Sequence, residues 1–220
     1  MEFYLDTADV ATVRRLAPIL PIKGVTTNPS IVARSKRPLA DVLQELASLL
    51  PADGRLFAQV MAREPQAMID DALRLREMVP SLVVKVPVTH NGLVVIKALT
   101  QQNIPTLGSA VYGAGQGLYA ALAGASYIAP YVNRIDAQGG DGVVLVKELQ
   151  KLVDLHAPQA KVLAASFRTA RQVLDCMLAG CRAITVDPDV AELFLQDPAV
   201  DNALQRFDQD WSAAYGSTTL

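Results

Sequence analysis

One short apolar run, LVVKVPV at residues 82–88, decides the fold class. Its β-branched residues favour a strand, and apolar residues occupy both faces of that strand instead of alternating with polar ones. A strand that is apolar on both faces is covered on both sides, as in parallel sheets whose crossover helices pack against them. The run therefore predicts an α/β protein, with Lys85 inside a buried strand.

Comparable runs recur along the whole chain. The predicted strands are Glu2–Leu5, Gly24–Thr27, Leu56–Val60, Leu82–Val88, Thr106–Ser109, Tyr127–Val132, Lys161–Ala165 and Ala183–Val186. Most are followed by a segment with helical periodicity, which implies parallel pairing through right-handed crossovers. Eight such units close a (β/α)8 TIM barrel, whose usual length is about 250 residues. An open doubly wound sheet is the alternative.

Several helical segments carry start and stop signals. Pro65 suits the first turn of one helix. Thr169 can cap another, and Gly180 can end it in the left-handed conformation. Asn91 can cap a helix over residues 93–102. These signals support the alternation of strands and helices.

One further helix is left over after the barrel has closed. Residues 190–195 already supply the eighth crossover, yet helical spacing of apolar residues continues from Asp197 to Tyr215. The stripe consists of Val200, Ala203, Leu204, Phe207 and Trp211. It must be buried across the barrel bottom or against another subunit, and Trp and Phe are typical interface anchors. We therefore expect an additional C-terminal helix, over about residues 198–215, that contacts another subunit.

Composition and charge exclude several function classes. The 220 residues have a formal net charge of -2, so they lack the basic surface that nucleic acids or anionic membranes attract. No linker divides the chain, which predicts one barrel domain over residues 1–220. Cys176 and Cys181 lack the spacing of a redox motif or zinc site, and the N-terminus lacks a signal peptide. We expect a cytoplasmic protein with reduced thiols.

Polar residues stand at or just after the carboxyl ends of nearly all predicted strands. In a parallel barrel these ends form the active site. The residues are Asp6, Thr26, Asn28, Gln59, Lys85, Ser109, Tyr131, Asn133, Arg134, Ser166 and Arg168. Any one of them could be a helix cap or a turn residue, but their joint placement around one ring favours a functional site.

Lys85 is the most informative of these residues. Desolvation of a buried ammonium group disfavours its charged form, and a neutral amine is a nucleophile. Such a lysine attacks a carbonyl to form a Schiff base, which serves as an electron sink when carbon–carbon bonds are made or broken. The alternative is a lysine at the strand end that reaches solvent or pairs with a carboxylate such as Asp6.

Other residues of the ring suit proton transfer and anion binding. Tyr131 lies at a strand end, where a phenol can act as acid or base through an ordered water; its alternative role is packing. Arg134 precedes a glycine-rich turn at residues 137–142, where backbone amides could meet an anion. Ser166 and Arg168 follow the seventh strand, where barrels frequently hold phosphate. For either arginine the alternative is an ion pair.

Motifs for metals and cofactors are missing. Gly113, Gly115 and Gly117 complete neither a dinucleotide fingerprint nor a P-loop, and we interpret them as close-packing glycines. Two histidines and two separated cysteines do not make a usual transition-metal cluster. The sequence predicts a site without metal or cofactor.

Four segments strongly resemble the transaldolase family. They are LDT at residues 5–7, GVTTNPS at residues 24–30, VVKVPV at residues 83–88 and APYVNR at residues 129–134. The resemblance spans essentially the whole chain. It is strongest to the fructose-6-phosphate aldolase branch, because Gln59 and Tyr131 stand where transaldolases typically have Glu and Phe.

This resemblance implies the chemistry of a metal-independent class I aldolase. Lys85 would form the imine with dihydroxyacetone or the ketose. Tyr131 would move protons through a water held by Gln59 and the hydroxyl of Ser109. The branch usually has Thr at position 109, so Ser109 keeps the hydroxyl and lacks a methyl group.

The resemblance also implies a substrate site and an assembly. Asp6 and Asn28 would bind sugar hydroxyls, and Thr26 would line the site. Arg134 and Ser166 would hold the acceptor phosphate, and Arg168, where relatives often have Lys, offers a bidentate fork that tunes phosphate affinity. Relatives form decamers of two stacked pentamers in which the C-terminal helix reaches a neighbour.

The resulting hypothesis is a homo-oligomeric enzyme that reversibly cleaves fructose 6-phosphate to dihydroxyacetone and glyceraldehyde 3-phosphate. One alternative is a transaldolase, which transfers the same three-carbon unit to a second aldose phosphate. Another is a catalytically silent barrel that binds sugar phosphates.

Overall fold

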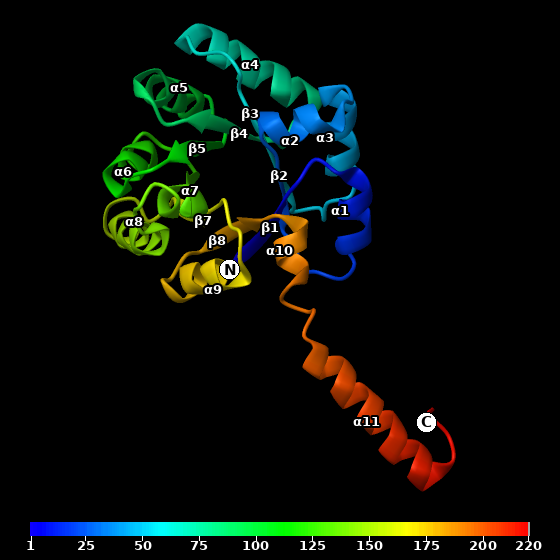
Figure 1. The fold of residues 1–220 in the computed structure, drawn as a ribbon. Coiled ribbons are helices and arrows are strands. Elements are labelled where there is room, and N and C mark those ends of the chain that lie inside the picture. The colour runs from blue at the N-terminus through cyan, green and yellow to red at the C-terminus, as the bar shows by residue number, and fades with distance from the viewer. Residues whose placement is uncertain (220) are drawn as a thin grey trace.

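The strands of this protein close into a barrel, as seen in a computed structural model that describes residues 1–219 (Figure 1). The strands are β1 (Glu2–Asp6), β2 (Gly24–Thr26), β3 (Arg55–Gln59), β4 (Val83–Pro87), β5 (Thr106–Val111), β6 (Tyr127–Pro130), β7 (Lys161–Ala164) and β8 (Ala183–Val186). Each is parallel to the next, and β1 pairs with β8 to complete the ring. The predicted (β/α)8 fold is confirmed, and the open doubly wound sheet is excluded.

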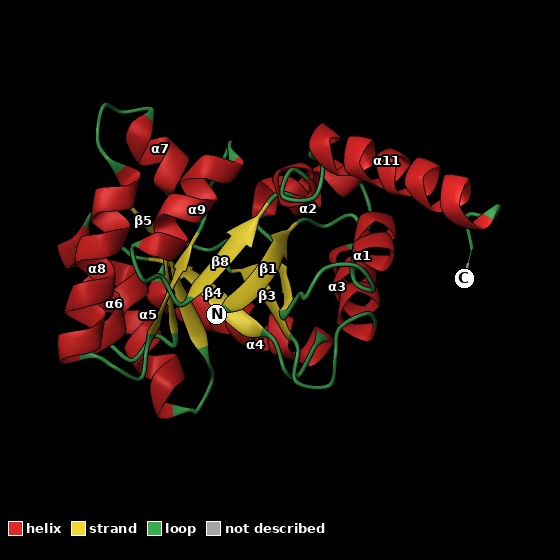
Figure 2. Cartoon of the chain, turned by 90° about the horizontal axis from the view of Figure 1, so that it is seen from below, coloured by secondary structure: helices red, strands yellow, loops and turns green. Residues whose placement is uncertain are grey.

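Helices surround the barrel (Figure 2). They are α1 (Val10–Leu16), α2 (Pro29–Ser35), α3 (Leu39–Ser48), α4 (Pro65–Met78), α5 (His90–Gln101), α6 (Ala114–Leu122), α7 (Val132–Asp136), α8 (Gly142–His156), α9 (Ala170–Leu178), α10 (Pro188–Glu192) and α11 (Pro198–Tyr215). Within residues 1–219, none of them has both the length and the apolar character that crossing a membrane requires.

The predicted helix cap is confirmed at α9 and wrong at α5. Thr169 caps α9 through a reciprocal capping box with Gln172, and Gly180 follows that helix with a φ of +92°. The predicted cap at Asn91 is wrong. Thr89 caps α5 by accepting the N–H of Gly92, so the helix starts earlier, and Asn91 lies in its first turn.

The three glycines at the start of α6 do not share one role. A Cβ on Gly117 would lie 2.8 Å from a methyl group of Leu149, so this position requires the close approach that we expected. Gly113 and Gly115 have open space around them. The close-packing interpretation therefore holds for Gly117 alone.

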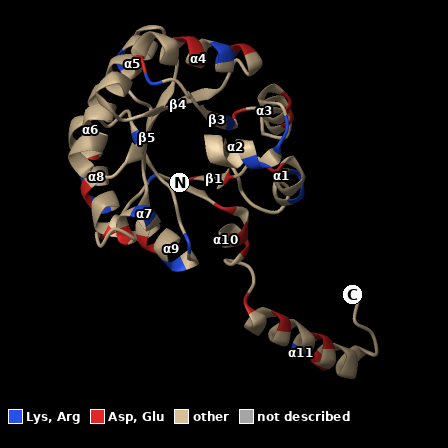
Figure 3. Cartoon of the chain, turned by 45° about the horizontal axis from the view of Figure 1, so that its top comes forward, with Lys and Arg blue, Asp and Glu red and all other residues tan. Residues whose placement is uncertain are grey.

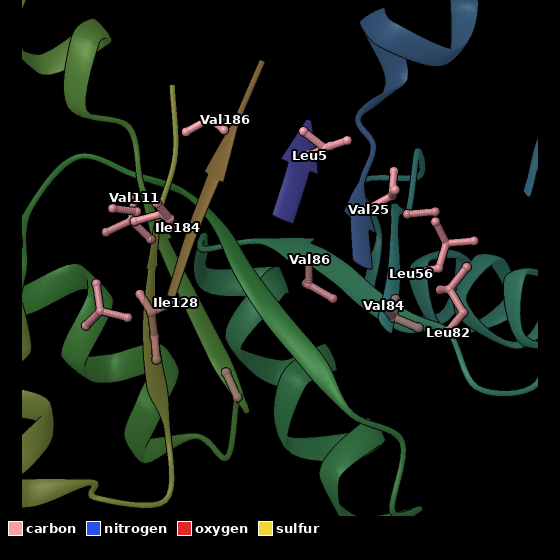
Figure 4. Packing of buried hydrophobic residues seen from close by; sticks show 14 of the residues in the cluster. Leu5, Val25, Leu56, Leu82, Val84, Val86, Val111, Ile128, Ile184 and Val186 are labelled. Carbon is pink, nitrogen blue, oxygen red and sulfur yellow. The ribbon is translucent and has the colours of Figure 1, made fainter. Parts of the chain in front are cut away.

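Alternation along the strands sorts side chains into two layers. One layer packs between the strands and the helices (Figure 4); its strand residues include Leu5, Val25, Leu56, Leu82, Val84, Val86, Ile128, Ile184 and Val186. The other layer fills the barrel interior and comprises Tyr4, Phe57, Val83, Leu107, Tyr127, Ala129, Leu163, Ala165 and Ala183. Two residues further along the strands, the inward positions become polar: Asp6, Gln59, Lys85, Ser109, Tyr131 and Thr185. The same period of two therefore builds both the core and a polar ring above it.

A polar cluster lies below the interior core, at the amino ends of the strands. The Glu2 carboxylate accepts hydrogen bonds from the hydroxyls of Tyr4 (2.9 Å) and Tyr127 (3.0 Å) and from Nζ of Lys161 (2.8 Å). The rings of Tyr4 and Tyr127 each meet Phe57 edge to face, with centroids 5.2 Å apart. Glu2 thus supplies the partner that these largely buried phenols need.

Helix α11 stands clear of the barrel and carries several acidic residues along its length (Figure 3). Asp197 caps it by accepting the N–H of Ala199, and none of its side chains is buried. Phe207 is 63% exposed, which excludes packing across the barrel bottom. The additional C-terminal helix is confirmed, and its contact with another subunit stays a prediction.

The Glu2 cluster makes stability depend on pH. Burial alone would raise the pKa of Glu2, but the hydrogen bonds from Lys161, Tyr4 and Tyr127 outweigh it and hold the pKa below its usual value. A carboxylate with a lowered folded-state pKa stabilises the fold above its unfolded pKa of about 4.3, and this contribution is lost as the pH falls through the folded-state value.

We therefore expect Glu2→Gln to lower the free energy of unfolding at pH 7 by about 1 to 2 kcal/mol, because a neutral amide accepts these bonds less strongly. The difference from the native protein should shrink towards pH 3. Urea unfolding at both pH values measures it, with Glu77→Gln on the outside of α4 as the control. An equal loss at both pH values would contradict this role of the Glu2 charge.

Candidate active site

A cavity of about 300 Å³ opens at the carboxyl ends of the strands. Most of the predicted ring residues line it: Asp6, Thr26, Asn28, Lys85, Tyr131, Asn133, Arg134, Ser166 and Arg168. The other two, Gln59 and Ser109, are connected to it through Tyr131: Ser109 contacts the Tyr131 hydroxyl, and Gln59 contacts Ser109. Apolar side chains of the interior core, among them Leu107 and Leu163, also line the cavity, so its polar groups stand directly on the packed core.

Lys85 lies on β4, buried in the wall of this cavity. Its side chain is one inward position above Val83, and the residue is 5% exposed. Nζ donates a hydrogen bond of 2.6 Å to the carbonyl of Thr27, and among residues 1–219 it forms no ion pair. The ion-paired alternative for Lys85 is therefore wrong in this structure. Its amine faces the cavity with a single neutral acceptor.

Tyr131, Ser109 and Gln59 form a hydrogen-bonded chain. The Ser109 hydroxyl donates to Oε1 of Gln59 at 3.2 Å. Since its only proton is used there, the Tyr131 hydroxyl is the donor in the 2.9 Å contact with Ser109. The Ser109 hydroxyl thus joins Gln59 to Tyr131, and the water that the resemblance implies at Gln59 and Ser109 stays a prediction.

A bulge in β5 follows Ser109 directly. Ala110 has a φ of +54°, an uncommon conformation for a residue with a Cβ, and the register between β5 and β6 shifts at this point. Ser109 points inward by regular alternation, two positions after Leu107, and the bulge that follows it turns Val111 to the outer layer. Without the extra residue, strict alternation would turn Val111 inward.

Arg134 holds Tyr131 from above. Strand β6 ends at Pro130, earlier than predicted, and Arg134 lies on the short helix α7. Its guanidinium carbon is 4.5 Å from the centroid of the Tyr131 ring, within cation–π distance. A hydrogen bond with Tyr112, more than the charge of nearby Asp6, raises the pKa of Arg134. The guanidinium is thus fixed as a cation at the cavity wall.

Asp6 ends β1, and its carboxylate interacts electrostatically with Lys85. Burial raises the pKa of Asp6, while the positive charge of Lys85 and a 2.7 Å hydrogen bond from Thr26 act in the opposite direction. Both polar residues therefore influence whether Asp6 is ionised. An ionised Asp6 can only accept hydrogen bonds, as sugar hydroxyls require of a partner.

The remaining predicted residues border the cavity from loops and helix starts. Asn28 caps α2 through its side-chain oxygen, which accepts the N–H of Ile31, so its amide nitrogen is left for other contacts. Ser166 has a φ of +64°, a strained conformation of the kind that clusters at functional sites. Arg168 forms no ion pair among the described residues, and neither does Arg134.

The glycine-rich turn at residues 137–142 does not line the cavity. Its amides are used within the protein: the N–H of Gly142 donates to the carboxylate of Asp136 at 2.7 Å. The anion site that we expected at this turn is therefore not formed.

Comparison with known proteins identifies the family. The family model for transaldolase/fructose-6-phosphate aldolase matches residues 3–218. The chain belongs to this family. Family membership supports aldolase-type chemistry on sugar phosphates and confirms the resemblance at the level of the family.

A solved structure gives independent support for the fold. A mutant of mandelate oxidase with a monooxide FMN adduct matches with a TM-score of 0.57 and 16% sequence identity. The match covers 84% of this chain and 63% of that chain, so the present chain spans less than two thirds of the oxidase. At this identity the similarity shows the barrel fold alone.

Several cavity residues of this family member were missed in the sequence. Thr185 and Asp187 come from the end of β8, and Arg34 comes from α2. Asp187 follows its strand just as Asn28 follows β2, so the same signal could have found it. Among the described residues, no group of three or more His, Cys, Asp or Glu side chains could hold a metal ion.

Removing the Tyr131 hydroxyl tests the hydrogen-bonded chain. Because Arg134 can still stack on a phenyl ring, Tyr131→Phe should keep the local packing and lose only the phenol. We expect turnover of a ketose phosphate to fall by roughly 10² to 10⁴, the usual contribution of a positioned acid or base. Stopped-flow and steady-state assays measure it, with Tyr119→Phe on the outer face of α6 as the control. Native turnover in Tyr131→Phe would assign Tyr131 to packing.

Proposed function

We propose that this protein is a class I aldolase that reversibly cleaves fructose 6-phosphate to dihydroxyacetone and glyceraldehyde 3-phosphate. The observation that carries the proposal is Lys85, a buried lysine that lines a polar cavity and has no ion-pair partner among residues 1–219. Family membership supports the reaction class. The finer choice of substrate and reaction depends on the residues around Lys85.

The reaction follows from the chemistry of the amine. Lys85 adds to the C2 carbonyl of the open-chain ketose, and loss of water gives an iminium ion. When the C4 hydroxyl loses its proton, the C3–C4 bond breaks, glyceraldehyde 3-phosphate leaves, and the bonding electrons move into the iminium to form an enamine. Protonation at C3 and hydrolysis of the imine then release dihydroxyacetone and restore Lys85.

Tyr131 is the proposed acid and base in these proton transfers. It lines the cavity with Lys85, and its hydroxyl donates a hydrogen bond to Ser109. Arg134, stacked on its ring, favours negative charge on the phenol oxygen when the hydroxyl proton leaves. Asp6 and Asn28 would bind the sugar hydroxyls.

One side of the cavity is basic and can bind the phosphate group of the acceptor aldehyde. Arg134, Arg168 and Ser166 follow β6 and β7 and line this side. Neither arginine forms an ion pair with a carboxylate among residues 1–219, so both cations are available to a phosphate dianion. This supports a phosphorylated aldehyde as the second product.

Gln59 favours an aldolase over a transaldolase. An amide can accept the hydrogen bond from Ser109 but cannot take up a proton, so the phenol of Tyr131 must carry the acid–base step. In a transaldolase the same imine would instead pass its three-carbon unit to a second aldose phosphate. The catalytically silent barrel is disfavoured because no carboxylate in the described part of the chain pairs with Lys85.

The decisive experiment supplies fructose 6-phosphate as the only sugar. We expect free dihydroxyacetone to form, because an aldolase hydrolyses its imine without a second aldose. Release that appears only after an aldose phosphate is added would favour the transaldolase. Neither release nor transfer would favour the silent barrel.

Covalent trapping tests the nucleophile separately. Dihydroxyacetone with borohydride should reduce the imine to a stable secondary amine, found at Lys85 by peptide mass spectrometry. Lys85→Met should not be trapped, and Lys97→Met on the outside of α5 is the matched control. An adduct confined to Lys97 or Lys147 would contradict the assignment of Lys85.

We also propose that α11 packs on a neighbouring copy in a homo-oligomer, a decamer by resemblance to relatives. Its apolar stripe is exposed on the single chain, with Leu204 at 54% and Phe207 at 63%. Contact with water is costly for such a stripe, and burial against another copy removes that cost.

Charged residues in the stripe should therefore disrupt the assembly. We expect Phe207→Asp combined with Trp211→Asp to lower the mass of the assembly in analytical ultracentrifugation, while Asp208→Asn on the same helix leaves it unchanged. A double variant with native mass would show that α11 does not hold the subunits together.

A further inference from the structure

A chain of hydroxyl groups crosses three neighbouring strands at the edge of the cavity. Oγ1 of Thr185 on β8 lies 2.7 Å from Oγ1 of Thr26 on β2. Thr26 in turn donates to Oδ1 of Asp6 on β1, also at 2.7 Å. Thr26 is fully buried and Thr185 is 3% exposed, so water does not compete strongly for either hydroxyl.

The direction of this chain follows from proton counting. Each threonine hydroxyl has one proton to donate. When Asp6 is ionised it can only accept, so the Thr26 proton is committed to Asp6. Thr26 must then accept in its contact with Thr185, and Thr185 is the donor. The proton of Thr185 therefore supports the ionised form of Asp6 through Thr26.

We propose that Thr185 is a positioning residue that acts through Thr26 to keep Asp6 an ionised acceptor of sugar hydroxyls. This inference rests on the proposed function, in which Asp6 binds the hydroxyls of the substrate. Thr185 touches Asp6 only through Thr26, so its effect is indirect. When Thr26 accepts a hydrogen bond from Thr185, its own hydroxyl becomes more polarised and donates more strongly to Asp6. Thr185 therefore affects Asp6 without touching it.

The surroundings of Asp6 explain why a remote hydroxyl matters. The pKa of Asp6 is raised overall, because burial and the charge of Asp187 after β8 outweigh the groups that oppose them. Lys85 on β4, the Thr26 hydroxyl and Arg134 on α7 lower it. Weakening the Thr26 donor shifts this balance towards the protonated acid, which donates a hydrogen bond and no longer only accepts.

Substitution of Thr185 isolates this effect. Thr185→Val keeps the shape of the side chain and removes only the hydroxyl, and Thr185→Ser restores it. Thr106→Val is the matched control, because Thr106 on β5 is also a buried threonine but its hydroxyl has no hydrogen-bond partner among the described residues.

The Asp6 carboxyl carbon can be titrated by ¹³C NMR in each full-length variant, with its signal assigned by its loss in Asp6→Asn. We expect the titration midpoint to rise by a few tenths of a pH unit in Thr185→Val, a fraction of what a direct neutral hydrogen bond contributes, because Thr185 acts only through Thr26. It should return to the native value in Thr185→Ser and stay there in Thr106→Val. Thr185→Ala gives the same comparison if the valine variant does not fold.

Kinetics provide the second readout. In Thr185→Val, the acid limb of the pH profile for fructose 6-phosphate cleavage should move to higher pH in step with the Asp6 midpoint, and KM should rise more than kcat falls. An unchanged midpoint, an equal shift in Thr106→Val, or no recovery in Thr185→Ser would overturn the proposal. The titration needs no substrate, so failure of imine trapping at Lys85 would contradict the aldolase function without altering this result.

Discussion

The burial of one amine on a strand of a closed barrel is the constraint on which the site depends. Lys85 lies directly above the side chains of Val83 and its inward neighbours, so no water reaches it from below. Leaving an ammonium group there without partners would be costly. Among residues 1–219, Lys85 has one hydrogen-bond acceptor, the neutral carbonyl of Thr27. It interacts with Asp6 only electrostatically, without an ion pair. The amine is thereby kept in contact with the cavity and not neutralised by a carboxylate.

Backbone irregularity occurs at two strand ends that border the site. Ala110 and Ser166, two of the non-glycine residues with positive φ, lie at the carboxyl ends of β5 and β7. Each such residue costs about 1 to 3 kcal/mol. At Ala110 the result is visible: Ser109 stays inward beside Tyr131 while Val111 packs outward. The regular hydrogen-bonded ring of strands below holds these local distortions in place.

The sequence predicted the strands because a parallel barrel buries both faces of each strand, which leaves apolar runs such as residues 82–88 without polar interruption. It predicted most of the site because polar residues ending such runs are conspicuous. Thr185 was missed since threonine inside a strand is also an ordinary β-former, and only the fold brings it to Thr26. Arg34 was missed with its helix, α2. Sequence periodicity found α11 but could not place it, because its packing surface is not on the same barrel.

The direction of the hydrogen bonds around Tyr131 links the choice of reaction to single residues. Gln59 accepts from Ser109, which commits the Tyr131 proton to Ser109 in the resting site. In the proposed reaction, Tyr131 gives its proton to the substrate only if the Ser109 hydroxyl turns from Gln59 towards the phenol oxygen, where it would stabilise the phenolate together with Arg134. A neutral amide at position 59 permits this rotation because it holds the serine proton only weakly. A carboxylate there would hold that proton more strongly and could itself act as the base, so the phenol would no longer be needed. Gln59 and Tyr131 therefore work as a pair, and exchanging one of them alone would leave the site with either two competing bases or none.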